Sequence, residues 1–282
     1  MSTVMDQKER QKAQWSAAAA GWDRWFDWYA RAFGPLMEWC CDAAGLAPGD
    51  RVLDLACGSG LPALLAARRV GPAGRVVAVD LSPDMLAVAR RRAHAAGLDN
   101  LEFMEMDAER LHFADASFDA VTCACGLMFL PDASGALGEI RRVLMPRGRL
   151  AAGVWDDPSK SPFLTTAGRA VAEYFPPSGP PDPKTPGAFR FAPPGVLESM
   201  LADAGFSSVT VRSLPMPIEC ASATQYWQVF VDMAAGIKEK VATLPRADQA
   251  RLEASVIEAA SAYLQDGLVR LSATALCAAA TR

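Results

Sequence analysis

A carboxylate followed by small residues stands near position 54 of the chain. The stretch Val52-Leu-Asp-Leu-Ala-Cys-Gly-Ser-Gly60 runs from apolar residues through Asp54 into a glycine-rich turn. Its small residues are Ala56, Gly58 and Gly60. Small residues let a ligand approach the backbone closely where a strand of an open α/β sheet ends. A second apolar stretch ends in Asp80, a carboxylate placed to accept the two hydroxyls of a ribose. This spacing predicts a site for a ligand that contains a nucleoside.

Two cofactors fit such a turn. Gly58, Gly60 and Ala63 satisfy the G-x-G-x-x-A spacing of dinucleotide-binding proteins, a pattern of low specificity. Asp54 argues against a dinucleotide, because a carboxylate ahead of the glycines repels a pyrophosphate and attracts a cation such as an amino-acid ammonium. We therefore favour S-adenosylmethionine, which carries an ammonium, a sulfonium and a ribose. An NAD-dependent reductase is kept as an alternative.

Asp54 and Asp80 can share one site only if the strands that carry them end at the same edge of a sheet. The chain shows the alternation of strands and helices that such a sheet requires. Apolar stretches predict strands over Arg51–Leu55, Arg75–Asp80, Leu101–Glu105, Phe118–Ala124 and Arg149–Trp155. Helices are expected over Leu61–Val70, Pro83–Ala96 and Ala133–Leu144. Ser82 and Pro83 are typical of the N-cap and first turn of a helix. Alternation of apolar strands with helices predicts a parallel sheet covered on both faces.

The two ends of the chain differ from this core. Aromatic residues at roughly helical spacing between Trp22 and Tyr29 predict one or two amphipathic helices within residues 1–45. Eight of the twenty prolines fall between Pro176 and Pro194, which predicts an irregular loop. The elements expected beyond it are a helix over Val196–Ala204, a strand over Ser207–Ser213, two or three helices within 223–260 and a closing strand over Leu268–Ala278.

Composition excludes several classes of protein. The 282 residues are 51% hydrophobic and 21% charged, with a formal net charge of −4. This is ordinary globular composition, without the basic field of a dedicated nucleic-acid binder. We expect no membrane span and no signal peptide, because no apolar run is long enough and the first residues are polar. Seven cysteines then predict reduced thiols in the cytoplasm, and their spacing does not predict a metal site.

Five ordered blocks resemble the class I S-adenosylmethionine-dependent methyltransferases. The stretch Asp54–Gly60 is similar to that family's first motif, with Ala56 where the family prefers glycine. Alanine stays small and suits ordinary dihedral angles at a strand end. The other blocks are Asp80-Leu-Ser-Pro-Asp-Met85 and the segments 106–111, 117–121 and 139–149. The most similar branch contains small-molecule enzymes related to ubiquinone and menaquinone biosynthesis. The resemblance implies a doubly wound, mostly parallel, seven-stranded Rossmann-like sheet with an antiparallel last strand and a helical lid.

The resemblance also implies a domain organisation and cofactor contacts. Residues 1–45 would form a helical lid, 46–155 the S-adenosylmethionine-binding core, and 156–282 the rest of the sheet with a helical insertion over the acceptor pocket. The first motif, with Asp54, Ala56, Gly58 and Gly60, would hold the methionine part of the cofactor, and Asp80 would hold the ribose. The further contacts are Leu81 and Met85 beside the adenine, Asp107 at its exocyclic amine, the Ala108 backbone at its ring edge, and Ala124 beneath the methionine part.

The segment after the fourth strand predicts an apolar acceptor pocket. Many relatives carry a histidine there, in a pattern like L-H-H-L-P-D, whereas this chain has Gly126-Leu-Met-Phe-Leu-Pro-Asp132. The usual base is therefore replaced, and no catalytic residue is assigned. His94 and His112 are expected to be surface or structural residues. The expected pocket residues are Trp22, Trp25, Tyr29, Met128, Phe129 and Trp155, with Asp23, Tyr29, Asp156 and Tyr226 as candidate polar contacts.

Together these observations predict methyl transfer from S-adenosylmethionine to O, N or C of a small hydrophobic or aromatic acceptor, leaving S-adenosylhomocysteine. Two alternatives stay open: C-methylation of a prenylated quinone, and a non-catalytic S-adenosylmethionine or nucleoside binder. Nucleic-acid methylation is disfavoured, because Ala124-Cys-Gly-Leu127 stands where base-modifying relatives carry an Asn/Asp-Pro-Pro-aromatic motif. A homodimer is compatible with the sequence.

Overall fold

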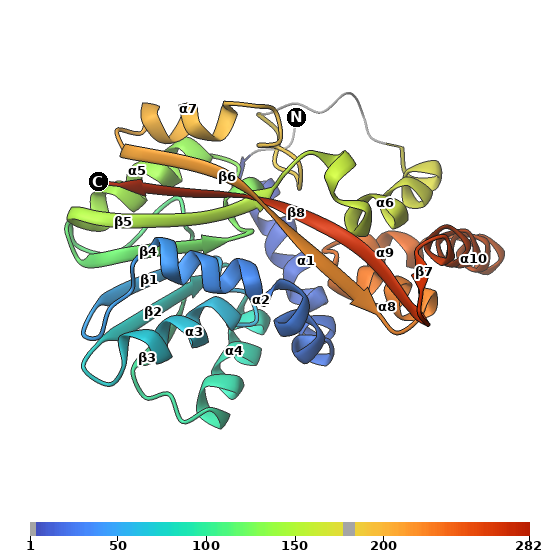
Figure 1. The fold of residues 1–282 in the computed structure, drawn as a ribbon, viewed down its shortest axis with the longest axis horizontal. Coiled ribbons are helices and arrows are strands. Elements are labelled where there is room, and N and C mark those ends of the chain that lie inside the picture. The colour runs from blue at the N-terminus through green and yellow to red at the C-terminus, as the bar shows by residue number, and fades with distance from the viewer. Residues whose placement is uncertain (1–3, 177–183) are drawn as a thin grey trace.

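The computed structural model describes residues 4–176 and 184–282, and its central sheet begins with the expected parallel strands. The first four are β1 (Arg51–Leu55), β2 (Arg75–Asp80), β3 (Leu101–Glu105) and β4 (Phe118–Ala124). They have the predicted bounds, whereas β5 (Leu144–Trp155) starts before the predicted Arg149. These strands pair in parallel in the order β3-β2-β1-β4-β5 (Figure 1). Parallel pairing brings their carboxyl ends to one edge of the sheet.

Two long antiparallel strands complete the sheet. β8 (Leu268–Thr281) pairs with β5 on one side and with β6 (Ser207–Cys220) on the other. The two-residue strand β7 (Leu264–Gln265) pairs with the start of β8, so the described residues form eight strands, the expected seven and this short addition. β6 continues through Pro215 and Pro217, beyond the predicted end at Ser213. An edge strand tolerates proline, because its outer side has no partner that needs an N–H.

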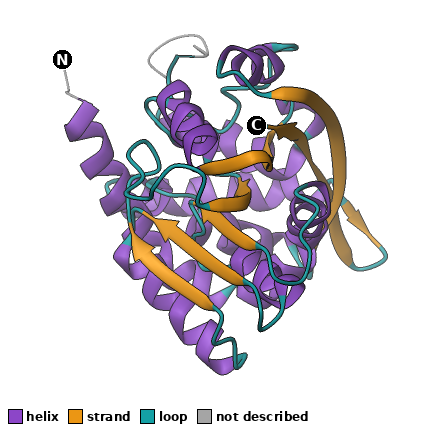
Figure 2. Ribbon diagram, turned by 90° about the vertical axis from the view of Figure 1, so that its left-hand side faces the viewer, coloured by secondary structure: helices purple, strands orange, loops and turns teal. Residues whose placement is uncertain are grey.

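Helices cover both faces of the sheet, as predicted for a doubly wound fold (Figures 1 and 2). The helices between the strands are α3 (Leu61–Val70), α4 (Pro83–Ala95), α5 (Ala133–Val143) and α7 (Val196–Asp203). The Ser82 hydroxyl caps α4 by accepting a hydrogen bond from the Met85 N–H at 3.2 Å. Helix α6 (Pro162–Tyr174) and the short 3₁₀ helices η1 (Leu127–Phe129) and η2 (Pro158–Lys160) were not predicted.

Five further helices complete the described part of the chain. They are α1 (Val4–Arg24), α2 (Phe26–Ala43), α8 (Ala223–Met233), α9 (Ile237–Ala242) and α10 (Arg246–Ser261). Helix α1 packs against α4 and α8, and α2 packs against α3, β5 and β6. Residues 184–194 of the expected proline-rich loop form turns and bends, and residues 177–183 lie outside the described part. None of the described helices is long and apolar enough to cross a membrane.

Candidate functional site

A cavity of about 420 Å³ lies where β1, β2 and β4 end. One wall comes from the loops that follow these strands, and the other from α1, α2, α6, α8 and the loop around Phe189. The motif stretch and the N-terminal helices, which are remote from each other in the sequence, therefore line one space.

The loop after β1 uses an unusual backbone. Ala56, Gly58 and Gly60 have φ values of 53°, 53° and 96°, in the left-handed region. A Cβ on Gly58 would meet no atom within 4 Å, so this residue leaves the cavity open for a ligand. A Cβ on Gly60 would lie 2.8 Å from that of Ala89 on α4, so Gly60 serves the packing of α4 and does not line the cavity.

Ala56 does not have the ordinary dihedral angles expected at a strand end. Its left-handed backbone is strained for a residue with a Cβ. A Cβ added to Gly126, which follows β4, would lie 2.5 Å from that of Ala56. The alanine at this motif position therefore requires a glycine on the neighbouring loop.

Asp80 joins the first two motifs. Its Oδ2 accepts the Gly58 N–H at 2.9 Å, and its Oδ1 accepts the Ser82 N–H at 2.9 Å. The carboxyl group lines the cavity, and burial raises its pKa above the usual value. Because each oxygen can accept a second hydrogen bond, the geometry suits recognition of a ribose diol.

Asp54 lies beneath the cavity surface and is fully buried. Its Oδ1 accepts the Thr122 hydroxyl at 2.7 Å, and among the described residues its Oδ2 has no hydrogen-bond partner. Burial raises the pKa of this carboxyl to about 7, and the negative charge of Asp80 adds to the rise. A buried carboxylate oxygen without a partner costs about 1–3 kcal/mol, so the site is suited to a cation brought by a ligand.

The expected adenine contacts come together at the β2 and β3 side of the cavity. All line it: Leu81, Met85, Asp107 and Ala108, with Ala124 at the end of β4. Asp107 Oδ1 accepts the Glu109 N–H at 2.9 Å, and its Oδ2 accepts the Lys8 ammonium at 2.6 Å. Lys8 also pairs with Glu109. Lys8 was not predicted, since no local pattern links α1 to a loop so remote in the sequence.

Helix α1 is held across the strand ends by further polar contacts. The Gln11 amide donates to the carbonyl oxygen of Phe129 at 2.8 Å, and the Ser16 and Ser82 hydroxyls are 2.9 Å apart. The ring of Trp15 lies edge-on to that of Phe129, with centroids 5.4 Å apart. Helix α1 thus covers the side of the cavity that holds the expected cofactor contacts.

Most of the expected acceptor-pocket residues line the same cavity. Those that do are Trp22, Tyr29, Met128, Phe129 and Trp155. Trp25 does not line the cavity: it stands at the turn between α1 and α2, and its indole N–H donates to Asp232 Oδ2 at 3.0 Å. Among the apolar and aromatic lining residues that were missed are Trp15, Trp28, Phe33, Met37, Phe163, Leu164, Phe189, Val229, Phe230, Met233 and Ile237.

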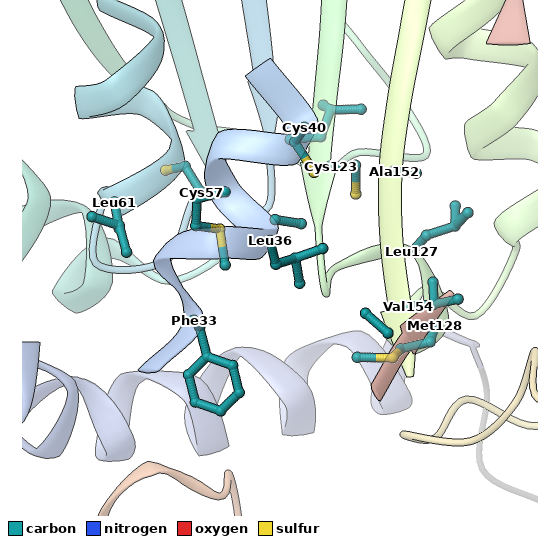
Figure 3. Close-up of a cluster of buried hydrophobic side chains, with 14 of the residues drawn as sticks. Phe33, Leu36, Cys40, Cys57, Leu61, Cys123, Leu127, Met128, Ala152 and Val154 are labelled. Atoms are coloured by element: carbon teal, nitrogen blue, oxygen red, sulfur yellow. The ribbon is translucent and has the colours of Figure 1, made fainter. Parts of the chain in front are cut away.

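The aromatic run of α2 contained a signal for some of the missed residues. Phe33 and Met37 follow Tyr29 at the four-residue spacing of one helical face, and all three line the cavity. Figure 3 shows Leu36 and Cys40 of the same helix among Cys57 and Cys123, with Phe33 pointing away from Cys40. Helix α2 therefore packs one face into the core and gives another to the cavity.

Of the candidate polar contacts, only Tyr29 lines the cavity. Asp23 pairs with Arg91 and Arg92. Asp156 accepts hydrogen bonds from Ser213 and Lys160, and the Tyr226 hydroxyl is bonded to backbone groups of α6. His94 and His112 are exposed and do not line the cavity, as predicted for surface residues.

Comparisons with known proteins identify the family of the chain. A family model described as a methyltransferase domain matches residues 52–148. Demethylmenaquinone methyltransferase of Thermus thermophilus is 40% identical over 187 residues, which are 62% of this chain and 84% of the relative. The ubiquinone/menaquinone biosynthesis C-methyltransferase UbiE of Pseudomonas putida is 33% identical over 182 residues, 61% of this chain and 71% of the relative.

Solved structures share the fold at lower identity. YcgJ from Bacillus subtilis superposes with a TM-score of 0.57 at 20% identity, covering 89% of this chain and 97% of that one. Phosphoethanolamine N-methyltransferase 2 from Haemonchus contortus, in complex with S-adenosyl-L-methionine, has a TM-score of 0.56 at 18% identity, covering 92% and 57%. By its identity to the curated relatives and by its fold, the chain belongs to the S-adenosylmethionine-dependent methyltransferase family that includes UbiE.

Proposed function

We propose that this methyltransferase acts on an uncharged aromatic or polycyclic small molecule. The observation that carries the proposal is the distribution of charge in the cavity. The charged residues that line it, among those described, are Lys8, Asp80, Asp107 and Glu109, all on the cofactor side. The acceptor end is built from aromatic and aliphatic side chains, which favour an apolar, uncharged molecule. The acidic net charge of −4 also supports a small molecule rather than a nucleic acid as the acceptor.

The residues at the strand ends fit S-adenosylmethionine. Asp80, fixed by two backbone N–H groups, would accept the ribose hydroxyls. The unpaired oxygen of Asp54 would face the ammonium of the methionine part, and Leu81 and Met85 would enclose the adenine beside Asp107. When bound, S-adenosylmethionine supplies an electrophilic methyl group on a sulfonium whose departure as a neutral thioether needs no acid.

The chain contributes alignment and exclusion of water. Met128 is fully buried in η1, at the position where the family pattern has a histidine, and Phe129 follows it on the cavity wall. Neither side chain can accept a proton, so no base is assigned to this segment. Orientation of the acceptor in a dry, aromatic pocket is then the main source of acceleration.

A quinol methylated at a ring carbon is a second, narrower candidate. It is favoured by the 40% identity to a demethylmenaquinone methyltransferase. The aromatic acceptor pocket suits such a ring, and a quinol carries no formal charge to conflict with the apolar wall. A homodimer stays a prediction, to be checked by light scattering.

The test is methyl transfer from labelled S-adenosylmethionine to a panel of phenols, amines and quinols, with products identified by mass spectrometry. Phe129→Ala should raise KM for an accepted aromatic compound about tenfold, because a contact ring is lost. Phe113→Ala is the matched control, since Phe113 packs against Phe118 outside the cavity. Equal KM values for both variants would refute the pocket assignment. Cofactor binding without transfer to any compound would favour the non-catalytic binder.

A further inference from the structure

Tyr29 brings a phenol hydroxyl to the aromatic part of the cavity wall, which is formed around it by Trp22 and Phe33. It lies on α2, is 8% exposed and lines the cavity. Its ring meets that of Trp22 edge-on, with centroids 4.8 Å apart, and is tilted against that of Phe33 at 5.5 Å. The phenol ring is therefore fixed by packing, and its orientation does not depend on its hydroxyl.

The Tyr29 hydroxyl lacks a strong partner. Its one contact among the described residues is the Met37 sulfur at 4.0 Å, and a thioether is a weak acceptor. The Tyr226 hydroxyl, also buried, accepts the Ala167 N–H at 2.9 Å and donates to the Phe163 carbonyl at 2.8 Å. A buried hydroxyl normally has such partners, and leaving one unsatisfied is unfavourable. The exception on a cavity wall points to a ligand atom as the missing partner.

The surroundings keep Tyr29 in its neutral form. Burial raises the pKa of its hydroxyl well above the usual value, and Cys125 after β4, Asp54 on β1 and Cys40 on α2 add to the rise. Asp54 lies near the end of β1 and Cys125 directly follows β4, so the phenol lies near the ends of these two strands. A neutral phenol cannot act as a base, but it is a good hydrogen-bond donor.

On the basis of the proposed function, we infer that Tyr29 donates a hydrogen bond to an oxygen of the methyl acceptor, which is therefore a phenol or a quinol. The donor stabilises the acceptor as its oxyanion. The acceptor hydroxyl gives its proton to water, and Tyr29 keeps its own. An electron pair of the acceptor forms the bond to the methyl carbon while the methyl–sulfur bond breaks, and the pair of the broken bond stays on sulfur. For methylation at carbon, the ring proton then leaves to water.

The test compares Tyr29→Phe with Tyr226→Phe. Each variant is assayed for methyl transfer to para-substituted phenols and to 1,4-naphthohydroquinone between pH 6 and 10. The affinity for S-adenosylhomocysteine and the melting temperature are measured in parallel. Tyr29→Phe should lower kcat at neutral pH about 10- to 100-fold and move its acid limb up by about one pH unit or more. S-adenosylhomocysteine affinity should stay the same, and the melting temperature should not fall. Tyr226→Phe should lower the melting temperature and leave the pH profile in place.

Three results would overturn the inference. An unchanged kcat and acid limb in Tyr29→Phe would show that the hydroxyl does not meet the acceptor. A loss of melting temperature equal to that of Tyr226→Phe would show that its role is structural. If the wild-type protein methylated amines alone, the acceptor would have no oxygen to receive the hydrogen bond from Tyr29, although the protein would still be a methyltransferase. Absence of transfer to every compound would instead refute the proposed function on which the inference rests.

Discussion

For ligands that carry an amino-acid ammonium, the binding affinity of this enzyme should depend on pH. Asp54→Asn should abolish that dependence. Asp54 is fully buried, its Oδ2 has no partner among the described residues, and burial raises its pKa to about 7. Below pH 7 the carboxyl is protonated and neutral in the free protein. If its charged form receives the ligand ammonium, binding must first remove that proton.

The size of the effect follows from this linkage. A raised pKa means that the free protein holds the proton up to about pH 7, so affinity rises with pH over this window and levels off above about pH 8. Relative to the plateau, affinity should be about tenfold weaker at pH 6 and about a hundredfold weaker at pH 5. These ratios correspond to about 1.4 and 2.7 kcal/mol.

Calorimetry with two ligands isolates the contribution of Asp54. S-adenosylhomocysteine carries the ammonium, whereas 5′-methylthioadenosine has the same ribose and adenine without it. Burial also raises the pKa of Asp80. Asp80 is assigned to the ribose, which both ligands carry, so its titration changes both affinities equally and cancels in their difference. The difference between the two ligands should vary with pH in the wild-type protein and be flat in Asp54→Asn. Equal pH slopes for both ligands in the wild type, or a slope that persists in the variant, would refute the reasoning.

Three further predictions, one of them with a control variant, test the site and its support. Asp80→Ala should weaken both ligands by roughly 1–3 kcal/mol, since both carry the ribose, and an unchanged affinity by calorimetry would remove the ribose assignment. Gly21→Ala should destabilise the protein by about 1–3 kcal/mol in urea denaturation, because the added Cβ would lie 2.2 Å from a carbonyl oxygen of α8. Gly34→Ala, whose Cβ meets no atom within 4 Å, is its control and should cause no loss. Ala56→Gly should stabilise by about 0.5–1 kcal/mol by relieving left-handed strain at φ 53°, and a loss of stability in the same assay would contradict this.

The strands and the cofactor motif could be predicted because their signals are local. A stretch such as Arg51–Leu55 is mostly apolar because helices cover both faces of a parallel sheet. Burial on both faces makes consecutive residues of the strand apolar. The end of β6 could not be predicted in this way. Pro215 and Pro217 indicate a break, and only the position of β6 at the edge of the sheet makes them acceptable.

The acceptor pocket was predicted in part, for a related reason. Helical spacing identifies an apolar face but does not say whether that face meets the core or a cavity. Trp25 was assigned to the pocket and instead donates to Asp232, whereas Phe33 and Met37 were left out and line the cavity. Lys8 pairs with Asp107, which lies 99 positions away in the chain. Periodic patterns in the sequence do not predict contacts over such a separation.

The sequence by itself determined the fold class and the order in which the motifs follow the parallel strands. It also identified the carboxylates that suit S-adenosylmethionine. Strand burial, helix capping and glycine-rich turns depend on residues that are neighbours in the chain. They can therefore be predicted from short stretches of sequence. The tertiary structure alone decided which side chains share the cavity. Among the described residues, it buried Asp54 without a partner for one oxygen, and it gave the Tyr29 hydroxyl only the Met37 sulfur, a weak acceptor. Whether a buried polar group is satisfied depends on atoms brought from distant segments, so only the packed molecule can show which groups await a ligand.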